Sequence, residues 1–201
     1  MVPSIGTRYD VPKGSVLPRM RDIIGSIAGE FGRYKKLGDQ TIMQLTDDEL
    51  TESGPGGGNS IAVLVWHLSG NLKSRFTDFL TADGEKPWRN RDEEFQPRAV
   101  LRCELLEKWE EGWTTLFRTL DSLSDNDLFK TIVIRGEEFR AHEALHRLMA
   151  HASYHVGQMV YLGKMFRSTD WKCLSIPLGK SEQVNRNPVG QRPQAPRSTS
   201  G

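Results

Sequence analysis

Apolar residues recur every three or four positions in four separate stretches of this chain, and each stretch is long enough for a substantial helix. Such spacing places the apolar side chains on one face of an α-helix, which can then pack against other helices. The pattern predicts helices over residues 15–38, 60–81, 100–120 and 141–166. Four amphipathic helices of this length indicate an all-α fold, and a four-helix bundle in particular.

The segments between these helices differ in character. A glycine-rich link at residues 54–58 precedes Ser60, whose hydroxyl could cap the second helix. Residues 83–97 are rich in charge and contain prolines, which predicts a long and partly ordered connection. β-Branched residues and a glycine within residues 131–139 predict a short β-hairpin or extended arm before the last helix.

One domain accounts for most of the chain. We expect the helical domain to span residues 15–180 and residues 1–14 to form a flexible N-terminal segment. Residues 181–201 hold prolines among Asn, Gln, Arg and Ser and offer little apolar surface to bury. This tail is therefore expected to be disordered.

Charge and composition narrow the classes of partner. The 27 Lys and Arg residues and 26 Asp and Glu residues are spread along the chain, and the formal net charge is +1, so no basic surface for nucleic acid is indicated. The longest apolar run, Ile61 to Trp66, is far too short to span a membrane. Cys103 and Cys173 form no CxxC pair, which argues against a disulfide framework. We therefore expect a cytoplasmic protein with neither a nucleic-acid nor a membrane partner.

Four of the five histidines lie on the last predicted helix, as the pairs His142/His146 and His151/His155. At about 100° per residue the two pairs project from opposite sides of the helix, so they cannot share one ion. The i, i+4 spacing brings two imidazoles within reach of one metal, although solvated surface histidines often have it too. We expect His142 and His146 to be neutral, partly exposed and without a metal, because a cation is disfavoured near the start of a helix.

His67 stands in a different setting. It follows the sequence IAVLVW, which is apolar on every side of the second helix and predicts that the histidine is buried. A buried imidazole needs a polar partner. That partner could be a backbone carbonyl or a carboxylate, or the ring could be a metal ligand, and this segment alone does not separate these readings.

The sequence HASYHVGQ at residues 151–158, together with the earlier histidine His67, resembles the HxxxHxGQ pattern of the DinB/YfiT-like superfamily of metal-dependent enzymes. The resemblance continues through residues 67–95 and 161–183 and covers most of the chain. It implies a four-helix bundle with a non-sequential helix order, commonly a homodimer. It also implies that His67, His151 and His155 bind a divalent metal ion, zinc or nickel in the first instance, although iron and manganese also accept imidazole.

Three imidazoles would leave at least one coordination position open to water or substrate. Relatives in the superfamily include thiol transferases and a thiol-dependent isomerase, so the resemblance implies an enzyme that transfers a low-molecular-weight thiol to an electrophilic small molecule. One alternative is a hydrolase that uses metal-bound hydroxide, and another is a non-enzymatic, stress-associated, metal-binding dimeric bundle. An open metal position that faces a pocket would favour an enzyme.

The sequence does not identify a general acid or base. Glu137 and Glu138 lie on the predicted hairpin and Glu143 lies two helical turns from His151, so none of them can be assigned a role. Tyr154 is about 100° around the helix from His155, and we expect it to pack against a neighbouring helix.

Other polar and aromatic residues can be explained by structural roles. Asn71, Arg75, Arg89 and Arg91 could bind an acidic group of a substrate, but salt bridges that position residues 83–95 are the favoured reading. Trp109 and Trp113 are expected to be core residues, because aromatic residues at helical spacing usually pack. Cys103 has no basic neighbourhood beyond Arg102 and is not expected to be a nucleophile.

Overall fold

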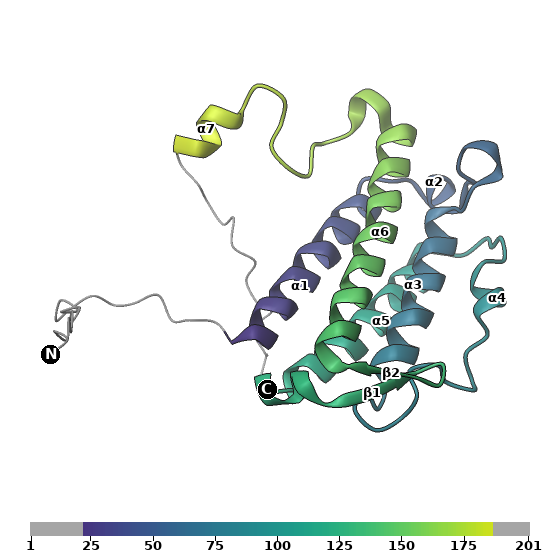
Figure 1. Cartoon of the computed structure of the whole chain (residues 1–201). Coiled ribbons are helices and arrows are strands. Elements are labelled where there is room, and N and C mark those ends of the chain that lie inside the picture. Colours follow the sequence, from purple (N-terminus) through teal and green to yellow (C-terminus); the bar gives the residue numbers. More distant parts are fainter. Residues whose placement is uncertain (1–21, 187–201) are drawn as a thin grey trace, which may run out of the picture.

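The computed structural model describes residues 22–186, and helices dominate it. These residues form seven α-helices and a two-stranded antiparallel sheet (Figure 1). The prediction of an all-α fold with a small β element is therefore confirmed. The elements are α1 (Ile23–Ile42), α2 (Asp47–Thr51), α3 (Ile61–Phe76), α4 (Arg91–Glu94), α5 (Arg102–Ser122), β1 (Thr131–Ile134), β2 (Glu137–Arg140), α6 (Ala141–Arg167) and α7 (Ser181–Arg186).

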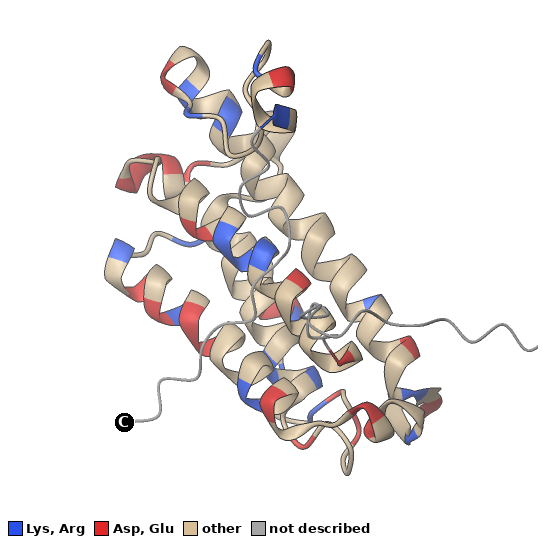
Figure 2. Cartoon of the chain, turned by 90° about the vertical axis from the view of Figure 1, so that its left-hand side faces the viewer, with Lys and Arg blue, Asp and Glu red and all other residues tan. Residues whose placement is uncertain are grey.

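The four long helices, α1, α3, α5 and α6, pack along one another around one apolar core (Figure 1). The most extensive contacts join α3 to α5 and α1 to α6, and smaller contacts join α3 to α6 and α1 to α5. Neighbours around the core therefore follow the order α1, α6, α3, α5, which is not the order along the chain. Basic and acidic residues are interspersed over the helices in Figure 2.

The predicted helix bounds agree with the structure to different degrees. Helices α5 and α6 lie within two residues of their predicted limits, and Ser60 caps α3 by accepting a hydrogen bond from the Val63 amide at 3.2 Å. The prediction that this helix continues to residue 81 is wrong, because α3 ends at Phe76 and Asp78 has a positive φ of 49°. Helix α1 ends at Ile42, beyond the predicted end at Gly38, and its predicted first residues, 15–21, lie outside the described part.

The core confirms the main apolar predictions. Trp109 and Trp113 of α5 are buried, as expected of packing residues, and α3 is buried over most of its circumference. Leu106, one of the apolar residues from which the helix over residues 100–120 was predicted, is instead 38% exposed. The indole nitrogen of Trp109 donates a hydrogen bond to Asp39 of α1 at 2.6 Å, so the core also ties α5 to α1.

The predicted arm at residues 131–139 is a β-hairpin, with Ile132 opposite Phe139. Arg135 and Gly136 form its turn with φ angles of 57° and 77°, which match the left-handed pair that a two-residue hairpin turn requires. The carboxylate of Asp83 accepts hydrogen bonds from both turn amides, each at 2.8 Å. These bonds fix the hairpin against the segment that follows α3, at one end of the helices.

Two expectations concern the end of the chain and membranes. Within the tail that was expected to be disordered, residues 181–186 form the short helix α7, which buries none of its residues. The rest of that tail and the N-terminal segment, residues 1–14, lie outside the described residues. Over residues 22–186, no helix combines the length and apolar character needed to cross a bilayer.

Gly112 of α5 permits the close approach of α5 to α3. A Cβ atom there would lie 2.7 Å from the Cα atom of Ser69, two residues from His67. Although alanine favours helix over glycine by about 1 kcal/mol, we expect Gly112→Ala to lower the free energy of unfolding by roughly 1 to 3 kcal/mol, because the helices must separate. At Gly157 of α6 an added Cβ would meet nothing within 4 Å, so Gly157→Ala is the matched control. Urea unfolding of both variants tests this, and a stabilised Gly112→Ala protein would contradict it.

Candidate metal centre

Three histidine side chains converge between α3 and α6. His67 lies near the middle of α3, and His151 and His155 lie one turn apart on α6. The Nε2 atom of His151 lies 3.2 Å from the Nε2 atom of His67 and 3.2 Å from that of His155. Over residues 22–186, these three residues form the one group of three or more potential metal ligands whose donor atoms all lie within 4.8 Å of one another. The candidate ligands His67, His151 and His155 are thus brought together.

The spacing of the nitrogen atoms fits a metal ion. Tetrahedral ligands with Zn–N distances near 2.05 Å lie about 3.3 Å from each other, close to the 3.2 Å separations here. His67 and His155 are buried and His151 is partly buried. The cluster could hold one divalent ion.

Hydrogen bonds on the far side of two rings direct their Nε2 lone pairs inward. The Nδ1 atom of His67 lies 2.9 Å from an oxygen of Glu94, and the Nδ1 atom of His155 lies 2.9 Å from the amide oxygen of Gln158. Both oxygens accept hydrogen bonds, so each neutral ring carries its proton on Nδ1 and keeps a lone pair on Nε2. Nε2 of His151, at 3.2 Å from both, can donate a proton to one of these lone pairs, or in its other tautomer can turn a third lone pair toward a shared cation.

The rings of His151 and His155 are also held in the neutral form that a metal requires. Burial, followed by the neighbouring rings of His155 and His67, lowers the pKa of His151 to about 3. Burial, together with His67, lowers the pKa of His155 to about 4. Both imidazoles are therefore unprotonated near neutral pH, and no proton competes there for their lone pairs.

Glu94, at the end of α4, supports the centre, and the sequence did not identify it. Arg89 donates two hydrogen bonds to this carboxylate, at 2.8 and 2.9 Å, while His67 donates the third. Burial opposes ionisation of Glu94, but the hydrogen bonds from Arg89 and His67 outweigh it and hold the pKa of Glu94 below its usual value. The hydrogen bond between His67 and Glu94 also bears on the readings of His67, since a buried carboxylate partner and a place among the converging histidines occur together.

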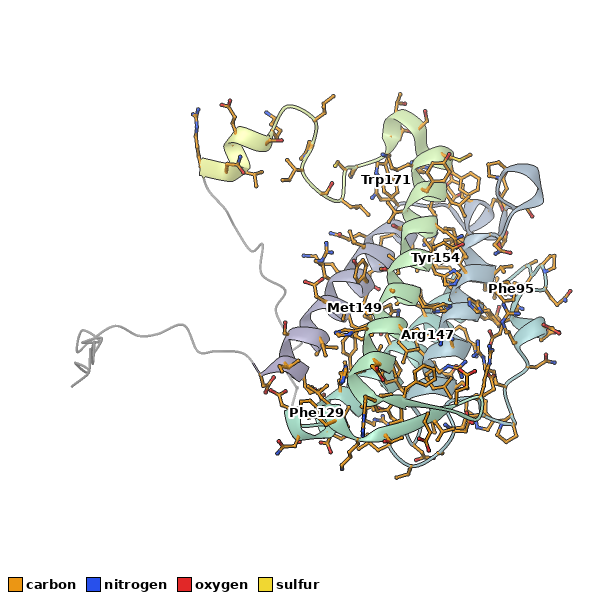
Figure 3. The ribbon with its side chains drawn as sticks, in the orientation of Figure 1. Phe95, Phe129, Arg147, Met149, Tyr154 and Trp171 are labelled. Carbon is orange, nitrogen blue, oxygen red and sulfur yellow. The ribbon has the colours of Figure 1, made fainter. Side chains whose placement is uncertain are left out.

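A pocket of about 630 Å³ opens directly onto the three histidines, and all three line it. Phe95 forms one wall, with its ring centroid 4.3 Å from that of His67. Tyr154 also lines the pocket and is 62% exposed, so the prediction that it packs against a neighbouring helix is wrong. Figure 3 shows Tyr154 and Arg147 along α6 and Phe95 on the segment that carries α4.

The polar residues of α3 and of the following segment have two roles. Arg75 donates to Glu85 at 2.9 Å and Arg89 binds Glu94, which confirms the prediction of ion pairs that position residues 83–95. Arg75 and Arg89 also line the pocket, together with Asn71 and Arg91. The prediction of salt bridges is therefore correct for Arg75 and Arg89, and these ion pairs do not exclude contact with a ligand.

The remaining candidates, Glu137 excepted, do not line the pocket. The rings of His142 and His146 lie 6.2 Å apart, and neither residue belongs to the three-histidine group. The carboxylate of Glu143 caps α6 by accepting from the Arg140 amide at 2.7 Å. Glu137 lines the pocket, a placement that the sequence could not supply. Cys103 is exposed and lines none of the pocket.

Comparison with known protein families gives one match. A family model described as "Protein of unknown function (DUF1572)" matches residues 20–180. These residues include all helices and strands from α1 through α6. A comparison with curated proteins finds no match. The match covers the whole candidate centre, so the three histidines, Glu94 and the pocket all lie within the family region.

Proposed function

This chain belongs to the DUF1572 family of proteins of unknown function, and on that premise we propose that it is a metal-dependent enzyme that transfers a low-molecular-weight thiol to an electrophilic small molecule. Its metal ligands would be His67, His151 and His155. Zinc or nickel is the first expectation for the ion, and iron or manganese would also suit imidazole ligands.

One observation carries this proposal: the three Nε2 atoms converge at the wall of a pocket. Over residues 22–186, no fourth His, Cys, Asp or Glu joins the group, so a bound ion would keep a position open toward the pocket. A structural ion is usually closed by a fourth protein ligand. The open position favours an enzyme over a non-enzymatic bundle in which the metal only joins two helices.

The chemistry follows from the donor set. A divalent ion on neutral imidazoles keeps its full positive charge and would lower the pKa of a thiol bound at the open position. The chain itself supplies the rest: Glu94 and Gln158 fix the orientation of His67 and His155. Phe95 and Tyr154 provide an aromatic wall against which the carbon skeleton of a substrate could pack.

The arrangement of the long helices supports the finer description of the fold, a four-helix bundle of the DinB/YfiT type. That type implies a non-sequential helix order, and the neighbours around this core follow the order α1, α6, α3, α5. The homodimer and the cytoplasmic location implied at the outset belong to the same proposal, and size measurement in solution would test the former.

Glu137 favours a second candidate function, hydrolysis. A hydrolase needs a general acid or base near the metal, and Glu137 is the carboxylate that lines this pocket within the described residues. In that case the electrophile would be an ester or amide, attacked by water instead of a thiol.

An activity assay tests the proposal and separates the two candidates. Metal-loaded protein is incubated with cysteine or glutathione and monochlorobimane, and separately with p-nitrophenyl acetate alone. The proposal predicts thioether formation above the uncatalysed rate by the wild type and by His146→Ala, and none by His155→Ala. Thioether formation at equal rates in all three proteins would contradict a catalytic metal. Ester cleavage without thioether formation would favour the hydrolase.

A further inference from the structure

The pocket beside the histidines is unusually rich in arginine. Five arginines line it, against a single lining carboxylate, Glu137. The lining arginines are Arg75, Arg89, Arg91, Arg135 and Arg147. Two carboxylates just outside the lining, Glu85 and Glu94, pair with three of these guanidinium groups, and exposed Asp92 lies 3.9 Å from that of Arg91. Positive charge remains in excess, and a pocket of this kind attracts anions.

Two polar groups of the pocket have no hydrogen-bond partner within the described part of the chain. Arg89 uses Nε and Nη2 on Glu94, but its Nη1 atom is unpartnered and lies 3.8 Å from the nearest oxygen of Glu85. The side chain of Arg89 is only 2% exposed. The buried Oδ1 atom of Asn71, on α3, is also unpartnered. Buried polar groups without partners are costly, so the Nη1 donor of Arg89 indicates an acceptor in the pocket. Oδ1 of Asn71 is itself an acceptor, so only the NH₂ group of this amide could donate to an anionic ligand.

The row of residues along α3 locates this ligand relative to the histidines. His67, Asn71 and Arg75 follow one another at intervals of four residues, and all three line the pocket. They therefore share one face of α3, and this row leads toward the hairpin. The segment after α3 is joined to the hairpin by a hydrogen bond from the Gly84 amide to the Val133 carbonyl at 2.8 Å. On α6, Arg147 lies one turn before His151, on the hairpin side, and its guanidinium lies 5.6 Å from the Phe139 ring of β2.

We propose that the hairpin side of this pocket is a subsite for the carboxylate of a small organic acid, bound by Arg89 Nη1, Arg147 and the side-chain amide of Asn71. A planar guanidinium group and an amide suit the two oxygens of a carboxylate. Over residues 22–186, Arg147 has no ion-pair partner among the acidic residues, so its charge is available to a ligand.

The spacing restricts the substrate class further. Asn71 and Arg147 each lie four residues, or about 6 Å of helix, from the nearest histidine of the centre. The reactive group of the substrate, held near the histidines, would thus lie about one helical turn from its carboxylate. An electrophile or thiol with a carboxylate three or four bonds away meets this requirement. This inference rests on the proposed function for the reactive group, whereas the subsite itself needs no metal.

Binding of simple carboxylates tests the subsite. Butyrate is titrated into the full-length protein, both metal-free and zinc-loaded, and binding is followed by NMR chemical shifts. Inorganic phosphate and neutral 1-butanol are titrated in parallel. We expect butyrate to bind both forms, at least tenfold more tightly than 1-butanol and more tightly than phosphate.

Three variants locate the binding. Arg147→Gln and Asn71→Asp are expected to raise the dissociation constant for butyrate at least tenfold. Arg118→Gln, on the exposed surface of α5 and outside the pocket, is the matched control and should leave it unchanged. Arg147 is exposed, so its replacement does not endanger the fold.

The possible failures are distinguishable. Equal dissociation constants in all variants, or no butyrate binding, would overturn the subsite even if the protein binds zinc at the histidines. Tighter binding of phosphate would overturn the assignment to a carboxylate. Variant-sensitive butyrate binding to a protein that binds none of zinc, nickel, iron and manganese would support the subsite and contradict the proposed metal-dependent function.

Discussion

Replacement of His155 by alanine is expected to remove the metal from this protein. With one of three imidazoles gone, two ligands on α3 and α6 remain, too few to hold a divalent ion through purification. Metal content measured by mass spectrometry should fall from about one ion per chain to near zero. His155 is buried at the pocket wall, so circular dichroism must accompany the measurement to show that the helices remain.

His146→Ala is the matched control for this prediction. His146 lies on the same helix, is exposed and takes no part in the three-histidine group. Its replacement should leave the metal content at the wild-type value. If His155→Ala retains the full metal content while folded, the ligand assignment is wrong.

Glu94→Ala is expected to have the second large effect, on both metal affinity and stability. The carboxylate orients His67, and loss of such a partner typically weakens metal binding about 10- to 100-fold. It also leaves the guanidinium of Arg89, only 2% exposed, without its bidentate partner. Loss of the partner of a buried charge should lower the free energy of unfolding by roughly 3 to 5 kcal/mol, toward the lower end because Glu85 remains 3.8 Å from Nη1 of Arg89.

Two measurements on this variant separate the two effects. Zinc affinity is measured by competition with a chelator, and stability is measured by urea unfolding of the metal-free protein. Glu93→Ala is the control, because Glu93 is exposed and adjacent in the same short helix, and it should change stability by less than about 0.5 kcal/mol. Wild-type zinc affinity in Glu94→Ala would show that Glu94 does not support the centre.

Periodicity predicted the helices well where a helix is regular and failed where the backbone leaves the helical path. Phe79 continues the apolar spacing of α3 and is buried, yet it lies beyond the helix end, because Asp78 adopts a left-handed conformation. An apolar pattern reports burial, and a non-helical segment can bury the same side chain.

The candidate centre was predictable in its ligands and not in its supports. The apolar residues around His67 indicated its burial, and the spacing of His151 and His155 placed them on one face, but only the resemblance to the DinB/YfiT-like superfamily grouped the three as ligands of one metal. Glu94 carried no comparable signal, because Asp92, Glu93 and Glu94 are three adjacent acidic residues in a charged segment. Because of the path that this segment takes across α3, Glu94 is the one of the three that is buried against His67.

The pocket could not be predicted, because it depends on how separate segments meet. Its arginines come from α3, the segment before α4, α4 itself, the hairpin turn and α6, and helical period alone gives no facing for those in loops. Tyr154 shows the same limit: its angle from His155 was correct, but that direction holds an open pocket instead of a helix.

The most direct test is anomalous X-ray diffraction at the zinc edge from crystals of the zinc-loaded protein. The proposal predicts one strong peak between α3 and α6, about 2.0 to 2.1 Å from the Nε2 atoms of His67, His151 and His155, with an open side toward the pocket. No peak among these three atoms, or a peak at His142 and His146 in its place, would contradict a metal centre at this position.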